Sequence, residues 1–204
     1  FNVNACNYTK SPTDGITSVY AHMLNVSPYG AIDMVGNCWE WTLEGKLPVV
    51  IDASSCSLFA KTPPSDGVSP EVLKKYSSLK LLDIVEFIHD YLLPNLALEP
   101  QNTSIVLHPN CSLVKMGLTD KMEEIAQRCS RNVTIPENLG CCGFAGDKGL
   151  NYPELTASAT KEEADEINKQ TFDGYYSSNV TCEMGMTSAT GATFRSIVFA
   201  VENA

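Results

Sequence analysis

The sequence has few basic residues and no long apolar run. Its 204 residues include 14 Lys and Arg against 24 Asp and Glu, which gives a formal net charge of −10. The acidic excess is spread along the chain without a basic stripe, which argues against nucleic acid or an anionic membrane as a partner. The longest apolar stretches, such as residues 47–51 and 197–201, have the length of a strand. We therefore expect neither a membrane-spanning segment nor a secretory signal.

Typical zinc-finger spacing is also absent, although cysteine is not scarce. Of eight cysteines, four lie at or beside expected strand–loop or loop–helix junctions: Cys111, Cys141, Cys142 and Cys182. Cys141 and Cys142 are adjacent, and neighbouring thiolates reach a multi-iron cluster more easily than they chelate one tetrahedral zinc ion. The pattern favours an iron–sulfur site. For any single cysteine, a buried hydrophobic side chain or half of a disulfide is the simpler interpretation.

Seven runs of sequence surround these cysteines and share one resemblance. They are residues 85–94, 108–117, 140–149, 153–159, 177–186, 188–191 and 195–198. Together they closely resemble the C-terminal cysteine-rich region of FAD-linked iron–sulfur D-lactate dehydrogenases. The resemblance implies that residues 47–204 form one CCG cysteine-rich domain with an α/β fold, built from strand–loop–helix units. It also implies that Cys111, Cys141, Cys142 and Cys182 bind an iron–sulfur cluster, for which a 4Fe-4S cluster is one form. A zinc ion is the alternative.

The same resemblance implies a function in electron transfer. The chain would be the iron–sulfur region of an FAD-linked D-lactate or other 2-hydroxyacid dehydrogenase, and it would pass electrons to a quinone or cytochrome. FAD would belong to a flavin-containing domain or subunit outside these residues. We expect a cytoplasmic location, with a peripheral position at the inner membrane as the alternative. A zinc-bound or metal-free structural domain is the competing interpretation.

One position departs from the pattern of related CCG modules. Those modules carry a lone cysteine, a Cys-Cys-Gly and a terminal Cys-x-x-Cys, whereas this chain has Gly185 at the last of these positions. Four candidate ligands remain instead of five, which leaves an ordinary four-iron cluster, a zinc ion or an empty site open. Cys56 resembles the tail of a preceding module. A thiol that approaches the site by pseudo-symmetry and a buried structural thiol are equally compatible with that position.

Residues 1–46 carry a second resemblance. The run 27–42 is similar to the central signature of formylglycine-generating, sulfatase-modifying enzymes and their C-type-lectin-like relatives. It implies a partial lectin-like segment in which the Asp33 and Glu40 side chains, with the Gly36 and Cys38 carbonyls, bind calcium. A calcium-binding fragment of such an enzyme is thus a third interpretation, and simple core packing of the neighbouring tryptophans is the alternative. A natural fusion, an artificial joint or an error of assembly would each produce this junction.

Hydrophobic periodicity predicts alternating strands and helices. Residues 47–51, 105–107 and 132–135 are strand-length runs, and residues 82–92 are a predicted helix that ends before Pro94. Residues 160–170 predict a charged, solvated helix, and residues 196–201 a last strand. Such repeated units imply a sheet whose ligand loops gather at the strand ends.

Several single residues follow from these elements. Cys129 lies on the apolar stripe of the helix before it and is therefore predicted to be core. Cys111 and Cys182 precede expected helices, with Thr181 as the cap of the second, where N–H groups and the helix dipole lower a thiol pKa. His108 is a candidate extra ligand, although a histidine before proline is more often a packed polar side chain.

Overall fold

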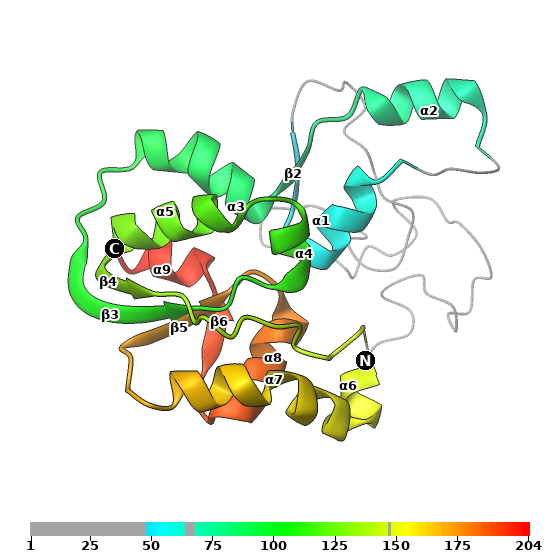
Figure 1. Cartoon of the computed structure of the whole chain (residues 1–204). Helices are drawn as coiled ribbons and strands as arrows, with labels where there is room; N and C mark the ends of the chain where they lie inside the picture. The colour runs from blue at the N-terminus through cyan, green and yellow to red at the C-terminus, as the bar shows by residue number, and fades with distance from the viewer. Residues whose placement is uncertain (1–47, 64–67, 147) are drawn as a thin grey trace, which may run out of the picture. The chain divides into compact units, whose positions relative to one another are not determined.

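The computed structural model describes residues 48–63, 68–146 and 148–204 (Figure 1). The chain divides into two units, residues 1–44 and 45–204, and every described element lies in the second. The calcium-site prediction, with Asp33, Gly36, Cys38 and Glu40, falls outside the described residues. It stays a prediction, as do the lectin-like resemblance and the proposed boundary between residues 46 and 47.

Two parallel sheets organise the described unit. β1 (Val49–Ile51) pairs with β2 (Leu81–Asp83). The larger sheet has the order β4-β3-β5-β6, with β3 (Gln101–Leu107), β4 (Ser130–Thr134), β5 (Gly174–Ser177) and β6 (Phe194–Ser196). All of its pairings are parallel, so each strand must be joined to the next by a crossover, here a helix. The predicted α/β fold is confirmed.

Helices cover both faces of the larger sheet (Figure 1). α5 (Thr119–Cys129) and α9 (Val198–Glu202) lie on one face, and α7 (Pro153–Ile167) and α8 (Val180–Thr190) on the other. Because side chains alternate along a strand, Ile105 and Leu107 join the first core and Val106 joins the second. Cys129 is 4% exposed in the first core, which confirms it as a packing residue.

The order of the strands reverses beside β3. From β3 the chain passes to β4 at one edge, then crosses back to β5 on the other side of β3 and continues outward to β6. In parallel sheets of this kind, ligands bind at the carboxyl ends of the strands where the order reverses. The loops that follow β3, β4 and β5 are therefore the ones to inspect.

The remaining helices are short. They are α1 (Ser54–Lys61), α2 (Pro70–Ser77), α3 (Ile84–Phe87), α4 (Cys111–Lys115) and α6 (Lys148–Asn151). The predicted helix 82–92 is divided: α3 begins after the capping box of Asp83 and Glu86 and runs into a π-helix (Ile88–Leu92) and a 3₁₀ turn (Leu93–Asn95). No helix of the described residues is long and apolar enough to cross a membrane.

Three sequence predictions about elements are wrong. Residues 196–201 are not a strand: β6 ends at Ser196 and α9 follows, because a short apolar run has no period that separates strand from helix. The charged helix begins earlier, as α7, and is not solvated on all of its acidic side, since Glu163 is 2% exposed. α8 begins at Val180 after Asn179, so Thr181 is not its cap.

Candidate functional site

Cys111 is placed by the cap of a helix. It is the first residue of α4, directly after the turn that ends β3. The Asn110 side-chain oxygen accepts hydrogen bonds from the N–H groups of Ser112 and Leu113, both at 3.1 Å. The amide nitrogen of Asn110 donates to the Ser178 hydroxyl at 2.8 Å. One side chain thus caps α4 and joins the loop after β3 to the loop after β5.

Cys182 lies at the equivalent point after β5. It is the third residue of α8, and its Sγ atom accepts a hydrogen bond of 3.4 Å from the side-chain amide of Asn179. The side-chain oxygen of Asn179 also accepts a hydrogen bond of 3.1 Å from the Ser55 hydroxyl. The Ser54 hydroxyl lies 2.8 Å from that of Ser178. The loop after β1 is therefore bonded to the loop that positions Cys182.

Cys141 and Cys142 lie in the loop after β4, and backbone geometry restricts this loop. Gly143 has φ +68°, a left-handed conformation that favours glycine. A Cβ atom at Gly143 would also lie 2.8 Å from the Cβ of Ala159 and 2.8 Å from the carbonyl oxygen of Leu155. Glycine after the two cysteines is thus required both by the turn and by the close approach of α7.

Two glutamates of α7 hold the same loop. Glu166 accepts hydrogen bonds from the N–H groups of Glu137 and Asn138 at 2.8 and 3.0 Å, and these bonds, that of Asn138 foremost, lower the pKa of its carboxyl. Glu163, one turn earlier, accepts the N–H of Gly140 at 3.2 Å. The residue directly before Cys141 is therefore tied to a buried carboxylate.

The four predicted cysteines meet as two pairs. The Sγ atoms of Cys111 and Cys141 are 3.8 Å apart, and those of Cys142 and Cys182 are 3.2 Å apart. Cys142 and Cys182 are each 4% exposed, whereas Cys111 is half-buried and Cys141 is exposed. The first pair faces the surface and the second lies inside the fold.

The pKa values of the two inner thiols are shifted in opposite directions. The hydrogen bond from the Cys182 thiol lowers the pKa of Cys142 to about 6, with further help from the N–H of Phe144 and from His108. The same hydrogen bond, followed by burial, raises the pKa of Cys182. Burial raises the pKa of Cys141, and the neighbouring Cys111 adds to this effect. Of the two inner thiols, Cys142 is thus the one that loses its proton more readily.

Cys56 does not belong to either pair. It lies in the first turn of α1 and is exposed, so the prediction of a buried structural thiol is wrong. The Cys56 thiol makes no hydrogen bond with the described residues of the cysteine site. Ser54 and Ser55, which precede it, do bond to the loop after β5.

The position of the missing fifth cysteine is also at the site. A Cβ atom at Gly185 would lie 3.3 Å from the Cβ of Cys142 and 3.2 Å from a methyl carbon of Thr156. A side chain at this position of α8 would therefore press directly on Cys142. Glycine leaves that space to the inner pair.

The donors fit a metal group that reaches both pairs. Within the described residues, no three His, Cys, Asp or Glu side chains are grouped so as to hold a single ion. Four soft thiols at three adjacent strand ends nevertheless match the donors of an iron–sulfur cluster, in which different thiols reach different irons. Two buried polar atoms beside the site, Nε2 of His108 and Oγ1 of Thr156, have no partner among the described residues. The site thus offers donors beyond its own internal bonds.

Comparison with known proteins agrees with this geometry. Residues 105–187, which span β3 to α8 and include all four cysteines, match the family model of the CCG cysteine-rich domain. The match is to this segment and not to the rest of the chain. The glycolate oxidase iron–sulfur subunit of Escherichia coli (strain K12) is 23% identical over 172 residues, which cover 81% of this chain and 42% of the relative. The chain thus spans less than half the length of that curated relative.

Some residues of the cysteine site were not identified from the sequence. Glu163 and Glu166 were assigned to a solvated face because their helix is rich in charge, yet they bind the loop that carries Cys141. Ser54 and Ser178 carry no motif that separates them from surface serines. A usable signal was the spacing of Thr156, Thr160 and Glu163, which places three polar residues on the buried face of α7.

Proposed function

We propose that the chain is the iron–sulfur electron-transfer region of a flavin-linked 2-hydroxyacid dehydrogenase. The observation that carries the proposal is the meeting of Cys111, Cys141, Cys142 and Cys182 at the carboxyl ends of three neighbouring strands. The CCG match and the iron–sulfur subunit among the relatives support it. In this proposal the four thiolates hold the cluster.

The residues around the cysteines suit such a group. When bound, an iron–sulfur cluster accepts and releases single electrons. The hydrogen bond with Cys182 lowers the pKa of Cys142, which favours the thiolate form that binds a metal. The side-chain amide of Asn179 donates to the Cys182 sulfur, and hydrogen bonds to ligand sulfurs raise the reduction potential of a cluster.

In this proposal, electrons enter or leave on the side of the outer pair, Cys111 and Cys141. Cys141 is exposed, and three large apolar side chains of the neighbouring segments are exposed with it: Leu139 at 36%, Tyr152 at 54% and Leu150 at 64%. Large exposed apolar side chains are available for contact with a partner protein. We assign it to a flavin-containing domain or subunit, which takes the hydride from the substrate.

The finer assignments follow from the resemblance and the relatives. The sequence resembles D-lactate dehydrogenases, and the relative is named for glycolate oxidase; both substrates are 2-hydroxyacids. We assign a quinone or a cytochrome as the final acceptor. A cytoplasmic location, with peripheral attachment to the inner membrane as the alternative, completes the proposal.

Anaerobic metal analysis tests the proposed function. The chain is purified without oxygen, its iron, acid-labile sulfide and zinc are measured, and its visible spectrum is recorded before and after dithionite. We expect iron and sulfide in similar amounts and a visible absorption that bleaches on reduction. A colourless chain with stoichiometric zinc would contradict the proposal.

Zinc is the second candidate, and one distance favours it. Four sulfurs at about 2.3 Å from a tetrahedral zinc ion lie about 3.8 Å from one another, and the Cys111 and Cys141 sulfurs are 3.8 Å apart. The 3.2 Å separation of Cys142 and Cys182 is too short for the same geometry. The outer pair alone thus fits zinc, which makes a structural zinc site the alternative outcome of the metal analysis.

A further inference from the structure

A buried imidazole and a buried carboxylate are bonded to each other beside the loops that carry Cys111 and Cys141. His108 follows the last residue of β3 and is 0% exposed, and Glu163 of α7 is 2% exposed. Nδ1 of His108 lies 2.7 Å from Oε1 of Glu163. A carboxylate can only accept, so Nδ1 carries the proton of this bond. In the neutral ring, Nε2 therefore holds a free lone pair.

That second nitrogen has no partner in the described part of the chain. A buried polar atom without a hydrogen bond destabilises a fold, so it is seldom kept without a partner. His108 lies three residues before Cys111, and its carbonyl oxygen accepts a hydrogen bond of 2.8 Å from the hydroxyl of Ser177, the last residue of β5. The unpartnered nitrogen thus belongs to a residue at the strand ends whose loops carry the thiols.

Glu163 bonds to both loops that lead to the cysteines. Its Oε1 atom accepts a hydrogen bond from Nδ1 of His108, which lies three residues before Cys111. Its Oε2 atom accepts one from the N–H of Gly140, which directly precedes Cys141. A histidine that binds a metal usually donates its other ring N–H to a carboxylate, which fixes the tautomer and the orientation of the ring. Glu163 and His108 have this arrangement.

Resting on the proposed function, we propose that His108 Nε2 is a nitrogen ligand of the metal centre and that Glu163 is its positioning residue. The imidazole then restores a fifth donor in a chain that has Gly185 where related modules carry a cysteine.

Nitrogen hyperfine spectroscopy tests the ligand directly. The whole chain is produced with ¹⁵N-histidine, reduced with dithionite and compared with unlabelled protein by pulsed electron paramagnetic resonance. We expect a ¹⁵N coupling of the size that a directly bound nitrogen gives. A weak coupling, or none, in a chain that contains iron and sulfide would overturn the inference and leave the proposed function standing.

Two variants and a matched control assign the signal. His89 is also bonded to a glutamate, Glu124 at 2.9 Å, but at the surface, so His89→Gln is the control. His108→Gln should remove the coupling and shift the reduction potential, whereas His89→Gln should change neither. Glu163→Gln keeps an acceptor for one of the two bonds and should release iron to a chelator about 10–100-fold faster, as expected for a lost carboxylate partner.

A zinc-bound chain would separate the two proposals in another way. The proposed function would then fail, and Co²⁺ in place of zinc would report the donors through its visible spectrum. A spectrum that His108→Gln moves and His89→Gln does not would still support the nitrogen ligand. An unchanged spectrum, or a chain that binds no metal, would overturn it. Far-ultraviolet circular dichroism of each variant establishes that it is folded.

Discussion

The two sheets of the described unit use the same local design with different results. In each, a parallel strand ends in a short polar turn and a helix begins, with a cysteine in its first turn: Cys56 after β1, and Cys182 after β5. Cys182 is buried and lies 3.2 Å from another thiol, whereas Cys56 is exposed. A helix start is thus not enough to make a site.

The difference lies in the number of strand ends that meet. β1 has one partner, β2, and the residues of these two strands belong to none of the hydrophobic clusters of the described unit. β3 has a partner on each side, so the loops after β3, β4 and β5 converge. The helix after β1 instead contributes Ser54 and Ser55, which bond to the loop after β5.

Removal of one inner thiol should give the largest effect. Cys142→Ser should lose its iron almost completely. The loss should exceed the roughly 10–100-fold drop in metal affinity that follows removal of a residue that only supports a ligand. Cys56→Ser should retain the iron of the wild type. Iron and sulfide per chain, measured after anaerobic gel filtration, report the outcome. Loss of iron from Cys56→Ser as well would break the comparison, because it would place the smaller sheet within the site.

Core truncations should separate the two sheets next. Leu107 of β3 is 0% exposed and belongs to the main core, so Leu107→Ala should lower the free energy of unfolding by about 2–5 kcal/mol. Ile51→Ala in β1 should lower it by about 2 kcal/mol or less. Urea unfolding followed by circular dichroism measures both, and Phe59→Ala, at an 84% exposed position, is the control. Equal losses at both sites would mean that β1 shares the main core.

Helix caps allow a finer comparison. Asn110→Ala removes the cap of α4 and the bond to Ser178, and should destabilise the fold by about 2 kcal/mol. Asp83→Ala removes the cap of α3, yet burial raises the pKa of Asp83 and one of its oxygens has no described partner. Its loss should therefore change the free energy of unfolding by about 1 kcal/mol or less. A larger effect for Asp83→Ala in urea unfolding would reverse the ranking of the two sheets.

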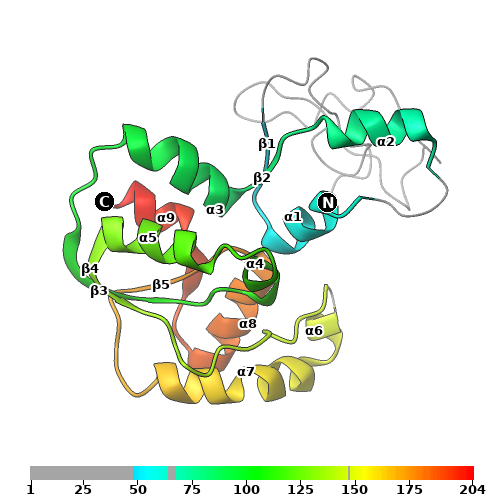
Figure 2. The same ribbon diagram turned by 45° about the horizontal axis from the view of Figure 1, so that its top comes forward.

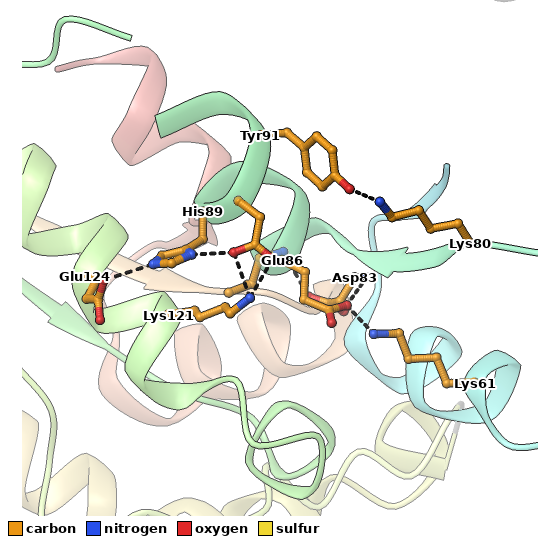
Figure 3. Close-up of polar contacts among 10 residues, drawn as sticks. Lys61, Lys80, Asp83, Glu86, His89, Tyr91, Lys121 and Glu124 are labelled. Atoms are coloured by element: carbon orange, nitrogen blue, oxygen red, sulfur yellow. Dashed lines mark hydrogen bonds and ion pairs between the residues drawn. The ribbon is translucent and has the colours of Figure 1, made fainter. Parts of the chain in front are cut away.

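The smallest effect concerns a surface network between the π-helix that follows α3 and α5 (Figure 3). Hydrogen bonds from Asp90 and then Glu124 raise the pKa of His89, and hydrogen bonds with Lys121 and then His89 lower the pKa of Asp90. Stability from His89 is present below its ordinary pKa of about 6.5 and is lost as the pH rises through the raised value. Stability from Asp90 is present above its ordinary pKa and is lost as the pH falls through the lowered one.

His89→Gln should therefore be less stable than the wild type near pH 5.5 and similar to it near pH 8.5. The groups are partly exposed, so solvent screening limits the difference to about 0.5 kcal/mol. Urea unfolding at both pH values, repeated at high salt, measures it. A difference that grows with pH would show that the His89 contacts act through packing and not through charge.

Much of the architecture followed from sequence. The strand-length run at Ile105 and the helical stripe ending at Cys129 have clear periods and were predicted in place. The prediction of a last strand was wrong because the apolar run after Ser196 has no clear period. The N–H of Ile197 bonds to the Ser177 carbonyl, and the chain then turns into α9. The charge of its helix led to the prediction that Glu163 is solvated. That prediction was wrong because a buried carboxylate and a solvated one look alike in sequence.

The arrangement of the site depends on chain crossings that sequence does not specify. Figure 2 shows the loop after β4 running from the sheet to α6, with α8 on the same side of the sheet and α4 beside α1. Cys111, Cys142 and Cys182 come from three separate crossovers, so their separations depend on strand order. That order is set by how helices pack on both faces of the sheet.

The sequence by itself determined which thiols are candidates, the glycine that follows Cys141 and Cys142, and the alternation of strands and helices, because these depend on residue type and local period. Only the tertiary structure decided that the thiols form an outer and an inner pair, that Cys56 is left at the surface, and that Glu163 lies beneath the site with His108. Burial and distance arise from contacts between segments 30 to 124 residues apart. No local pattern carries that information.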